Sequence, residues 1–226
     1  PNDKPEIEVV LAGSGPVQKP VAFPQPFVTG KGTVLTVPLS EGILYPVDDE
    51  AIQPSQLIAY GGMGMSMPWF GAFDEPSGAG VLAILRTPDD ARIDITRQAD
   101  SGLFIRPLWE ASRQQFQYER KITYVFLEKG GYVAQAKRYR EYARQTGLFK
   151  TLAEKRRENP NVDLLIGAAN IWNWDMDEVA LCREMKALGM DRILWSKGAK
   201  PETIKAINEL GFLTSRYDIY QDVWST

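Results

Sequence analysis

The last third of the chain alternates between strand-like and helix-like segments, and this alternation constrains the fold more than any other feature. We predict strands over Val162–Ile166, Arg192–Trp195 and Phe212–Tyr217, because each is a short and largely apolar run. Two amphipathic helical segments lie between them, opening near Asp175 and at Pro201. Alternation of this kind builds a parallel sheet, and the eight-stranded β/α barrel is a common way to close one.

Three strands cannot close such a barrel, so we interpret the chain as a fragment cut within its catalytic domain. Asp175-Met-Asp-Glu178 resembles a capping box, with Asp175 as the cap, and Gly189 and Gly211 stand where a helix end favours a left-handed residue. An open sheet leaves unpaired edges and an uncovered apolar face. We therefore expect this part to associate with the missing remainder of the barrel or with itself.

The first half of the chain has a different pattern, typical of an antiparallel β-sandwich. Arg92-Ile-Asp-Ile-Thr96 alternates polar and apolar residues, which predicts a strand with one buried face. The predicted strands are Thr33–Val37, Leu57–Tyr60, Val81–Leu85, Ala91–Thr96, Leu103–Ile105 and Phe116–Leu127. We expect an α+β multidomain fold: a β-sandwich over residues 1–130, a helical connector over 131–160, and the first three β/α units of a TIM-type barrel over 161–226.

Composition excludes several classes of function for these residues. The net charge is −3 with both signs interspersed, which gives no support for a nucleic-acid or membrane partner. The sequence contains no histidine, so His-based triads and His metal sites cannot form within it. Its single cysteine, Cys182, excludes an internal disulfide, and we expect a buried structural thiol. The start at Pro1 indicates a trimmed N-terminus from which an export signal has gone.

Polar and aromatic residues gather after each predicted barrel strand, where the βα loops of a barrel converge. Aromatic rings stack on the apolar faces of sugars, while carboxylates and amides bind sugar hydroxyl groups. The sequence therefore predicts a sugar-binding rim at this end of the barrel. Its candidate residues are Trp172, Trp174, Asp175, Lys197, Asp218 and Asp222.

Each of these candidates also has an ordinary structural interpretation. Asp175 fits equally well as the N-cap of the following helix. Trp172 and Trp174 are suited to packing between barrel and sandwich, and Lys197 to a solvated loop. Asp218 has the strongest functional claim, because it follows the third strand among polar and aromatic neighbours.

The sandwich contains one comparable cluster, the glycine-, methionine- and aromatic-rich segment from Gly61 to Gly71. Its apolar side chains are too many for free exposure, which indicates a contact between domains. The alternative is that Trp69 or Phe70 reaches the barrel mouth, with Trp69 as the candidate that binds substrate there. Asp48-Asp-Glu50 lacks the ligand spacing of a calcium loop, so we predict no metal site.

The chain as a whole resembles bacterial glycoside-hydrolase-like proteins with an N-terminal β-sandwich and a (β/α)8 catalytic barrel, in the broad neighbourhood of glycoside hydrolase families 101, 129, 36 and 31. The segments that carry the resemblance are Val34–Leu39, Tyr45-Pro-Val-Asp48, Met67-Pro-Trp-Phe-Gly71, Thr87-Pro-Asp-Asp-Ala91, Lys137-Arg-Tyr-Arg140 and Leu165-Ile-Gly-Ala168.

The resemblance implies a glycosidase of the retaining type that acts on α-linked glycans, without a cofactor and outside the cytoplasm, secreted or periplasmic. Its nucleophilic aspartate follows a middle strand and its acid/base a later one, so both catalytic carboxylates are expected beyond residue 226. The catalytic residues are therefore unknown, and the fragment alone is expected to be inactive. The alternative is a non-catalytic carbohydrate-binding or structural protein. A nucleotide-binding enzyme is disfavoured, because no glycine-rich phosphate loop follows any strand.

Overall fold

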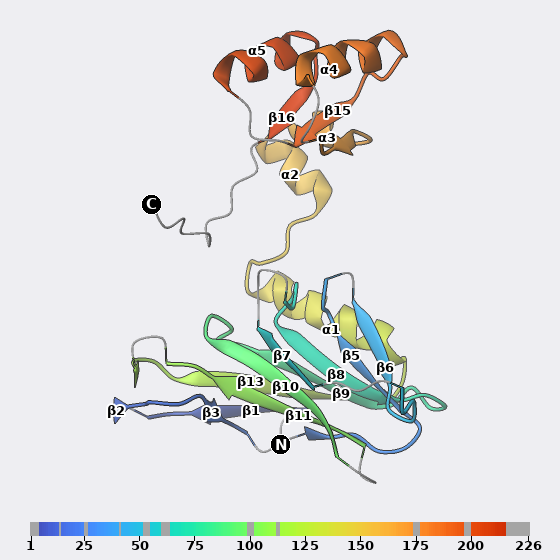
Figure 1. Cartoon of the computed structure of the whole chain (residues 1–226). Helices are drawn as coiled ribbons and strands as arrows, with labels where there is room; N and C mark the ends of the chain where they lie inside the picture. Colours follow the sequence, from blue (N-terminus) through green and yellow to red (C-terminus); the bar gives the residue numbers. More distant parts are fainter. Residues whose placement is uncertain are drawn as a thin grey trace. The chain divides into compact units, whose positions relative to one another are not determined.

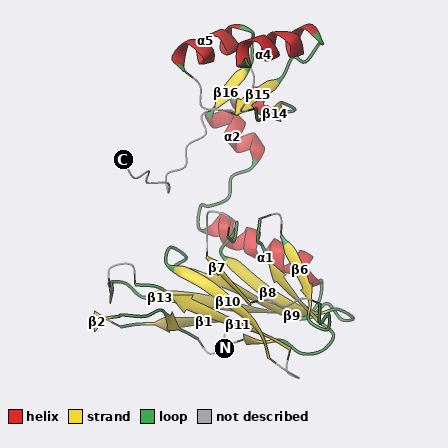
Figure 2. Ribbon diagram, in the orientation of Figure 1, coloured by secondary structure: helices red, strands yellow, loops and turns green. Residues whose placement is uncertain are grey.

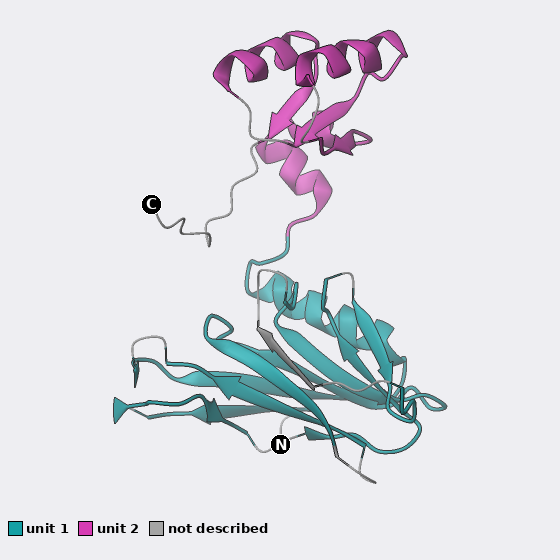
Figure 3. Cartoon of the chain, viewed as in Figure 1, with its two compact units in different colours: residues 1–149 teal, residues 150–226 magenta. Residues whose placement is uncertain are grey.

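The computed structural model describes residues 5–13, 15–24, 27–40, 42–51, 55–59, 64–98, 102–111, 114–173, 177–196 and 200–215. The chain divides into two compact units, residues 1–149 and residues 150–226 (Figure 3). The boundary falls within the predicted connector, so that its first helix, α1 (Gly131–Gln145), belongs to unit 1.

Unit 1 is built on two antiparallel sheets, which confirms the predicted antiparallel sheet structure (Figures 1 and 2). The larger sheet has the spatial order β1 (Glu6–Leu11), β13 (Arg120–Leu127), β9 (Gly80–Leu85), β8 (Trp69–Asp74), β5 (Thr33–Val37) and β6 (Ile43–Pro46). The second has the order β3 (Val21–Ala22), β11 (Gly102–Trp109), β10 (Ala91–Gln98) and β7 (Ser55–Ala59), and β4 (Phe27–Val28) also pairs with β11. A short ribbon joins β2 (Gly15–Pro16) to β12 (Gln115–Phe116).

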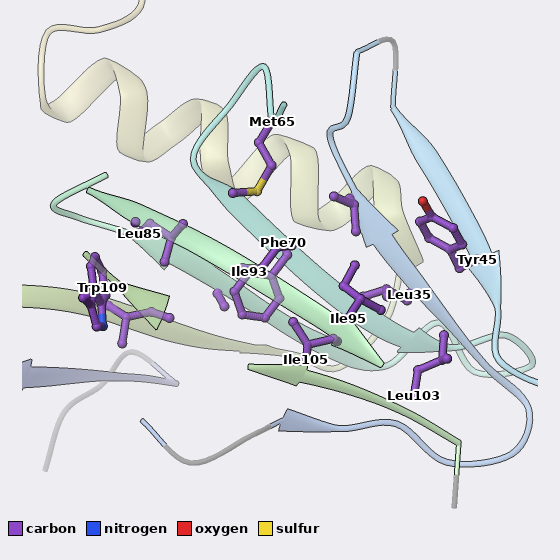
Figure 4. Packing of buried hydrophobic residues seen from close by; sticks show 14 of the residues in the cluster. Leu35, Tyr45, Met65, Phe70, Leu85, Ile93, Ile95, Leu103, Ile105 and Trp109 are labelled. Carbon is purple, nitrogen blue, oxygen red and sulfur yellow. The ribbon is translucent and has the colours of Figure 1, made fainter. Parts of the chain in front are cut away.

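One hydrophobic core fills the space between the two sheets (Figure 4). Phe70 and Leu35 of the larger sheet belong to the same buried cluster as Ile93, Ile95 and Ile105 of the second. Burial of each such side chain stabilises the fold by roughly 1.5–3 kcal/mol. The alternation predicted for β10 is confirmed, because the two isoleucines of this strand are fully buried while Arg92 and Asp94 between and beside them form ion pairs.

The other face of the larger sheet is covered by α1 (Figure 1). Tyr139 of this helix lies against Trp69 of β8, with ring centroids 6.1 Å apart. Gln135 is fully buried, and its Nε2 donates to the backbone oxygens of Ala72 and Val81, each at 3.1 Å. These two hydrogen bonds fasten the helix to the paired strands β8 and β9.

Gly71 of β8 makes this close approach possible, because a Cβ atom at this position would lie 2.7 Å from Gln135 Nε2 and 2.7 Å from Val81 O. We expect Gly71→Ala to lower the free energy of unfolding by about 1–3 kcal/mol, since the buried amide cannot move without losing its hydrogen bonds. Urea unfolding measures this change. The control is Gly13→Ala, where a Cβ meets nothing within 4 Å. Equal stability of the two variants would contradict the prediction.

Unit 2 carries a three-stranded parallel sheet in the order β14 (Ala169–Ile171), β15 (Ile193–Ser196) and β16 (Leu213–Ser215). Its helices are α2 (Leu152–Glu158), α3 (Val162–Leu165), α4 (Glu178–Ala187) and α5 (Pro201–Glu209). Pro201 is at the start of α5, as predicted, and Gly189 and Gly211 both have φ 86° just after their helices.

The predicted strand over Val162–Ile166 is wrong. This run forms the short helix α3, and the first strand begins at Ala169. A short apolar run is ambiguous between helix and strand, and here the preceding Pro160 and the acidic Asp163 in the first turn favour a helix.

The interpretation of Asp175 as the N-cap is also wrong. The cap of α4 is Asp177, whose side chain accepts a hydrogen bond from Ala180 N at 3.0 Å. The segment contains two aspartates, Asp175 and Asp177, either of which could cap a helix judged by sequence alone. Asp177 is the cap because α4 begins at the next residue.

Helices α4 and α5 pack on one face of the parallel sheet. Cys182 of α4, Ile207 of α5 and Trp195 of β15 are all fully buried in this cluster. Cys182 is the expected buried thiol, and burial raises its pKa to about 11, so the thiol stays protonated at neutral pH. No described helix is long and apolar enough to cross a membrane.

Candidate functional site

Three polar residues are joined across the parallel sheet of unit 2, one from each strand. Ser215 Oγ of β16 donates to Ser196 Oγ of β15 at 2.9 Å. Ser196 Oγ in turn donates to Asn170 Oδ1 of β14 at 2.5 Å. Both serines are the last residues of their strands, so this polar ladder lies toward the carboxyl edge of the sheet. Ligands bind at this edge in parallel α/β folds.

Strand alternation decides which residues take part in the ladder. Ile171, Ile193 and Trp195 pack into the cluster beneath α4 and α5. Successive side chains of a strand point to opposite faces, so their neighbours Asn170 and Ser196 lie on the face away from these helices. Ser196 is only 4% exposed, whereas Asn170 is exposed to solvent. The middle member of the ladder is therefore buried, and its Asn170 end lies at the surface.

Trp172 is the one predicted site residue that the structure describes in unit 2. It directly follows β14, two residues after Asn170, and 49% of it is exposed. An indole this exposed presents an apolar surface, and it lies two residues from Asn170 along the chain. Such a pair suits a ligand that has both an apolar face and hydroxyl or carbonyl groups.

Most of the other predicted residues are not described by the structure. Trp174, Asp175, Lys197, Asp218 and Asp222 lie outside the described residues. Trp69 belongs to unit 1, where it is 3% exposed and is covered by α1. Its buried ring is not presented to a ligand.

The candidate site residues predicted from the sequence did not include Asn170, Ser196 or Ser215. The available signal was their position: each is at or near the end of a strand, and each has the opposite parity to the apolar residues that pack under the helices. Small polar residues at such positions are easily taken for loop residues. Their hydrogen bonds join residues 26 and 19 positions apart, which no local pattern contains.

The described side chains at this edge are amides, hydroxyls and one indole, with no carboxylate among the ladder residues. Asp177, the nearest described aspartate in sequence, caps α4. No group of three or more Asp, Glu, His or Cys residues that could hold a metal ion occurs in the part of the chain that the structure describes. The arrangement is suited to binding a neutral polar ligand.

No family model matches the chain, and no curated protein sequence matches it. Among solved structures, the chain is similar to the α-N-acetylgalactosaminidase NagBb from Bifidobacterium bifidum. The GalNAc complex of that enzyme matches with TM-score 0.70 and 22% identity over 88% of this chain and 41% of the other. A quadruple mutant matches with TM-score 0.74 and 19% identity over 95% of this chain and 44% of the other.

At this level of identity the similarity establishes the fold alone. The chain has a glycoside-hydrolase-like fold of mixed α and β structure with antiparallel sheets. It spans less than half the length of the structures that it matches.

Proposed function

We propose that the chain is part of a glycoside hydrolase that acts on α-linked glycans, in the broad neighbourhood of families 101, 129, 36 and 31. In this proposal unit 1 is the N-terminal β-sandwich with its helix, and β14 to β16 are the opening strands of a TIM-type barrel. The observation that carries the proposal is the structural match to an α-N-acetylgalactosaminidase over 88–95% of the chain.

The open edges of the parallel sheet agree with this proposal. Strands β14 and β16 each pair on one side only within the described sheet. Unpaired edges and an uncovered face normally acquire a partner. Further β/α units are the partner that completes a barrel, and self-association is the alternative.

Substrate binding is assigned to the carboxyl edge of the sheet, with Trp172 as its described aromatic residue. Trp174, Asp175, Lys197, Asp218 and Asp222 stay in the proposed rim, because all follow one of the three strands in the sequence. We leave Trp69 out of it, since this side chain is buried under α1. The indole stacks on the apolar face of the sugar, and the amides and carboxylates bind its hydroxyls.

The catalytic carboxylates are assigned to residues beyond 226. A retaining glycosidase needs two carboxyl groups about 5 Å apart, one as nucleophile and one as acid/base. Within the described part of the sheet edge, the ladder supplies only amide and hydroxyl groups. The present chain would then hold the substrate, and the remainder of the barrel would cleave it, in a secreted or periplasmic enzyme.

The test is a calorimetric titration of the chain with N-acetylgalactosamine (GalNAc), the sugar bound in one of the similar structures. We expect binding, and we expect Trp172→Ala to weaken it about two- to tenfold, because stacking contributes roughly 0.5–1.5 kcal/mol. Leu188→Ala is the matched control, since this leucine is also exposed in unit 2, at 76%. Absence of binding to the parent chain, or equal affinities in the two variants, would contradict the proposed site.

A further inference from the structure

The polar ladder contacts the Asn170 amide at its oxygen, Oδ1. Each serine hydroxyl has one proton to donate. Ser215 gives its proton to Ser196, and Ser196 gives its own to Asn170 Oδ1. The amide oxygen is therefore the end that faces the ladder. The Nδ2 group, which carries two N–H bonds, is turned away from Ser196.

The amide nitrogen is the open end of this network. No residue in the described part of the chain accepts a hydrogen bond from Asn170 Nδ2, and the side chain is exposed. Its hydrogen-bond partner Ser196, the middle member of the ladder, is almost completely buried. Its hydrogen bond to Asn170 Oδ1 holds the oxygen end of the amide toward the sheet.

We propose that Asn170 is a specificity-determining hydrogen-bond donor of the sugar site, and that Ser196 and Ser215 are its positioning residues. This inference rests on the proposed function and assigns a role to a residue outside the predicted candidate set. The group that Asn170 binds is a neutral oxygen acceptor of the sugar, either a ring hydroxyl or the carbonyl of an acetamido group.

Pre-orientation is what makes such a donor selective. An amide that is already held in the binding orientation loses little conformational freedom when the ligand arrives. A ligand without an oxygen at the matching position leaves the donor unsatisfied once water is excluded, which is costly. Selectivity therefore depends on the two serines as well as on Asn170 itself.

The experiment is a titration of the whole chain with GalNAc and with galactose, followed by calorimetry and by NMR of the ¹⁵N-labelled side-chain amides. Asn170→Asp keeps the shape of the side chain but replaces the donor with an acceptor. We expect about tenfold or greater loss of affinity. Ser196→Ala should weaken binding less, about threefold, and should shift the Asn170 amide signals in the absence of sugar, because the amide is no longer held in one orientation.

Asn208→Asp is the matched control. It makes the same chemical change on α5, where Asn208 Oδ1 accepts from Thr214 Oγ1 at 3.1 Å, and an aspartate there can still accept. We expect its affinity for both sugars to equal that of the parent chain. Circular dichroism confirms that all variants are folded.

The pair of sugars identifies the acceptor. Loss of affinity in Asn170→Asp for GalNAc alone indicates the acetamido carbonyl, and an equal loss for both sugars indicates a hydroxyl. Parent-like affinity of Asn170→Asp for both sugars overturns the inference and leaves the proposed function standing. A parent chain that binds neither sugar overturns both.

Discussion

Arg120→Met is expected to lower the free energy of unfolding by about 3–5 kcal/mol, because it leaves a buried carboxylate without its cation. The Arg120 side chain is 2% exposed, and its Nη2 lies 2.5 Å from Oδ2 of Asp90, whose side chain is 11% exposed. The guanidinium also lies between the rings of Phe116 and Tyr118, each centroid 3.9 Å from its Cζ atom. No other ion pair described in unit 1 has both partners as deeply buried.

Urea unfolding at neutral pH measures the effect, with Arg106→Met as the control. Arg106 forms a similar pair with Asp94 at 2.6 Å, but its side chain is 45% exposed, and such surface pairs contribute about 0–1 kcal/mol. The double variant Arg120→Met with Asp90→Asn should recover part of the lost free energy of unfolding, because it removes the unpaired buried charge of Asp90. A loss below about 1 kcal/mol in Arg120→Met would show that Asp90 finds another partner or stays hydrated.

Trp69→Ala is expected to destabilise unit 1 by about 3–5 kcal/mol and to leave sugar affinity unchanged. The indole is 3% exposed and packs with Tyr139 and Ala143 of α1 and with Leu82 of β9. Its removal leaves a cavity at the contact that holds the helix on the sheet. Trp172→Ala is expected to do the reverse: it should weaken sugar binding and change the free energy of unfolding by less than about 0.5 kcal/mol.

Thermal melts paired with the GalNAc titration separate the two tryptophans. Trp172 is 49% exposed, so its truncation opens no cavity in the core. Weaker sugar binding by a folded Trp69→Ala variant would return this residue to the substrate rim and would contradict the role in packing.

Much of the secondary structure could be predicted from the sequence, because it depends on local rules. The alternation around Ile93 and Ile95 predicted one buried face, and both residues are fully buried. Pro201 marked the first turn of α5, and Gly189 and Gly211 marked helix ends. Each of these signals acts within one turn or one strand.

The errors occurred where local signals compete. Val162–Leu165 reads as an apolar strand, yet it forms a helix whose leucines are about half exposed. A run of four or five apolar residues carries no period long enough to separate helix from strand. Both Asp175 and Asp177 were suitable as the N-cap of α4 by residue type. Asp177 is the cap, because the helix begins one residue after it.

Local sequence signals were enough to predict the order α4, β15, α5 and β16, the glycine and proline boundaries of these helices, and the alternation that buries one face of β10. The tertiary structure was needed to show that Trp69 packs against Tyr139, which lies 70 residues further along the chain in α1. Only it joined Asn170, Ser196 and Ser215 into a directed network. The physical reason is range: propensity and periodicity act over a few residues, whereas burial and hydrogen-bond partners depend on which distant segments the fold brings together.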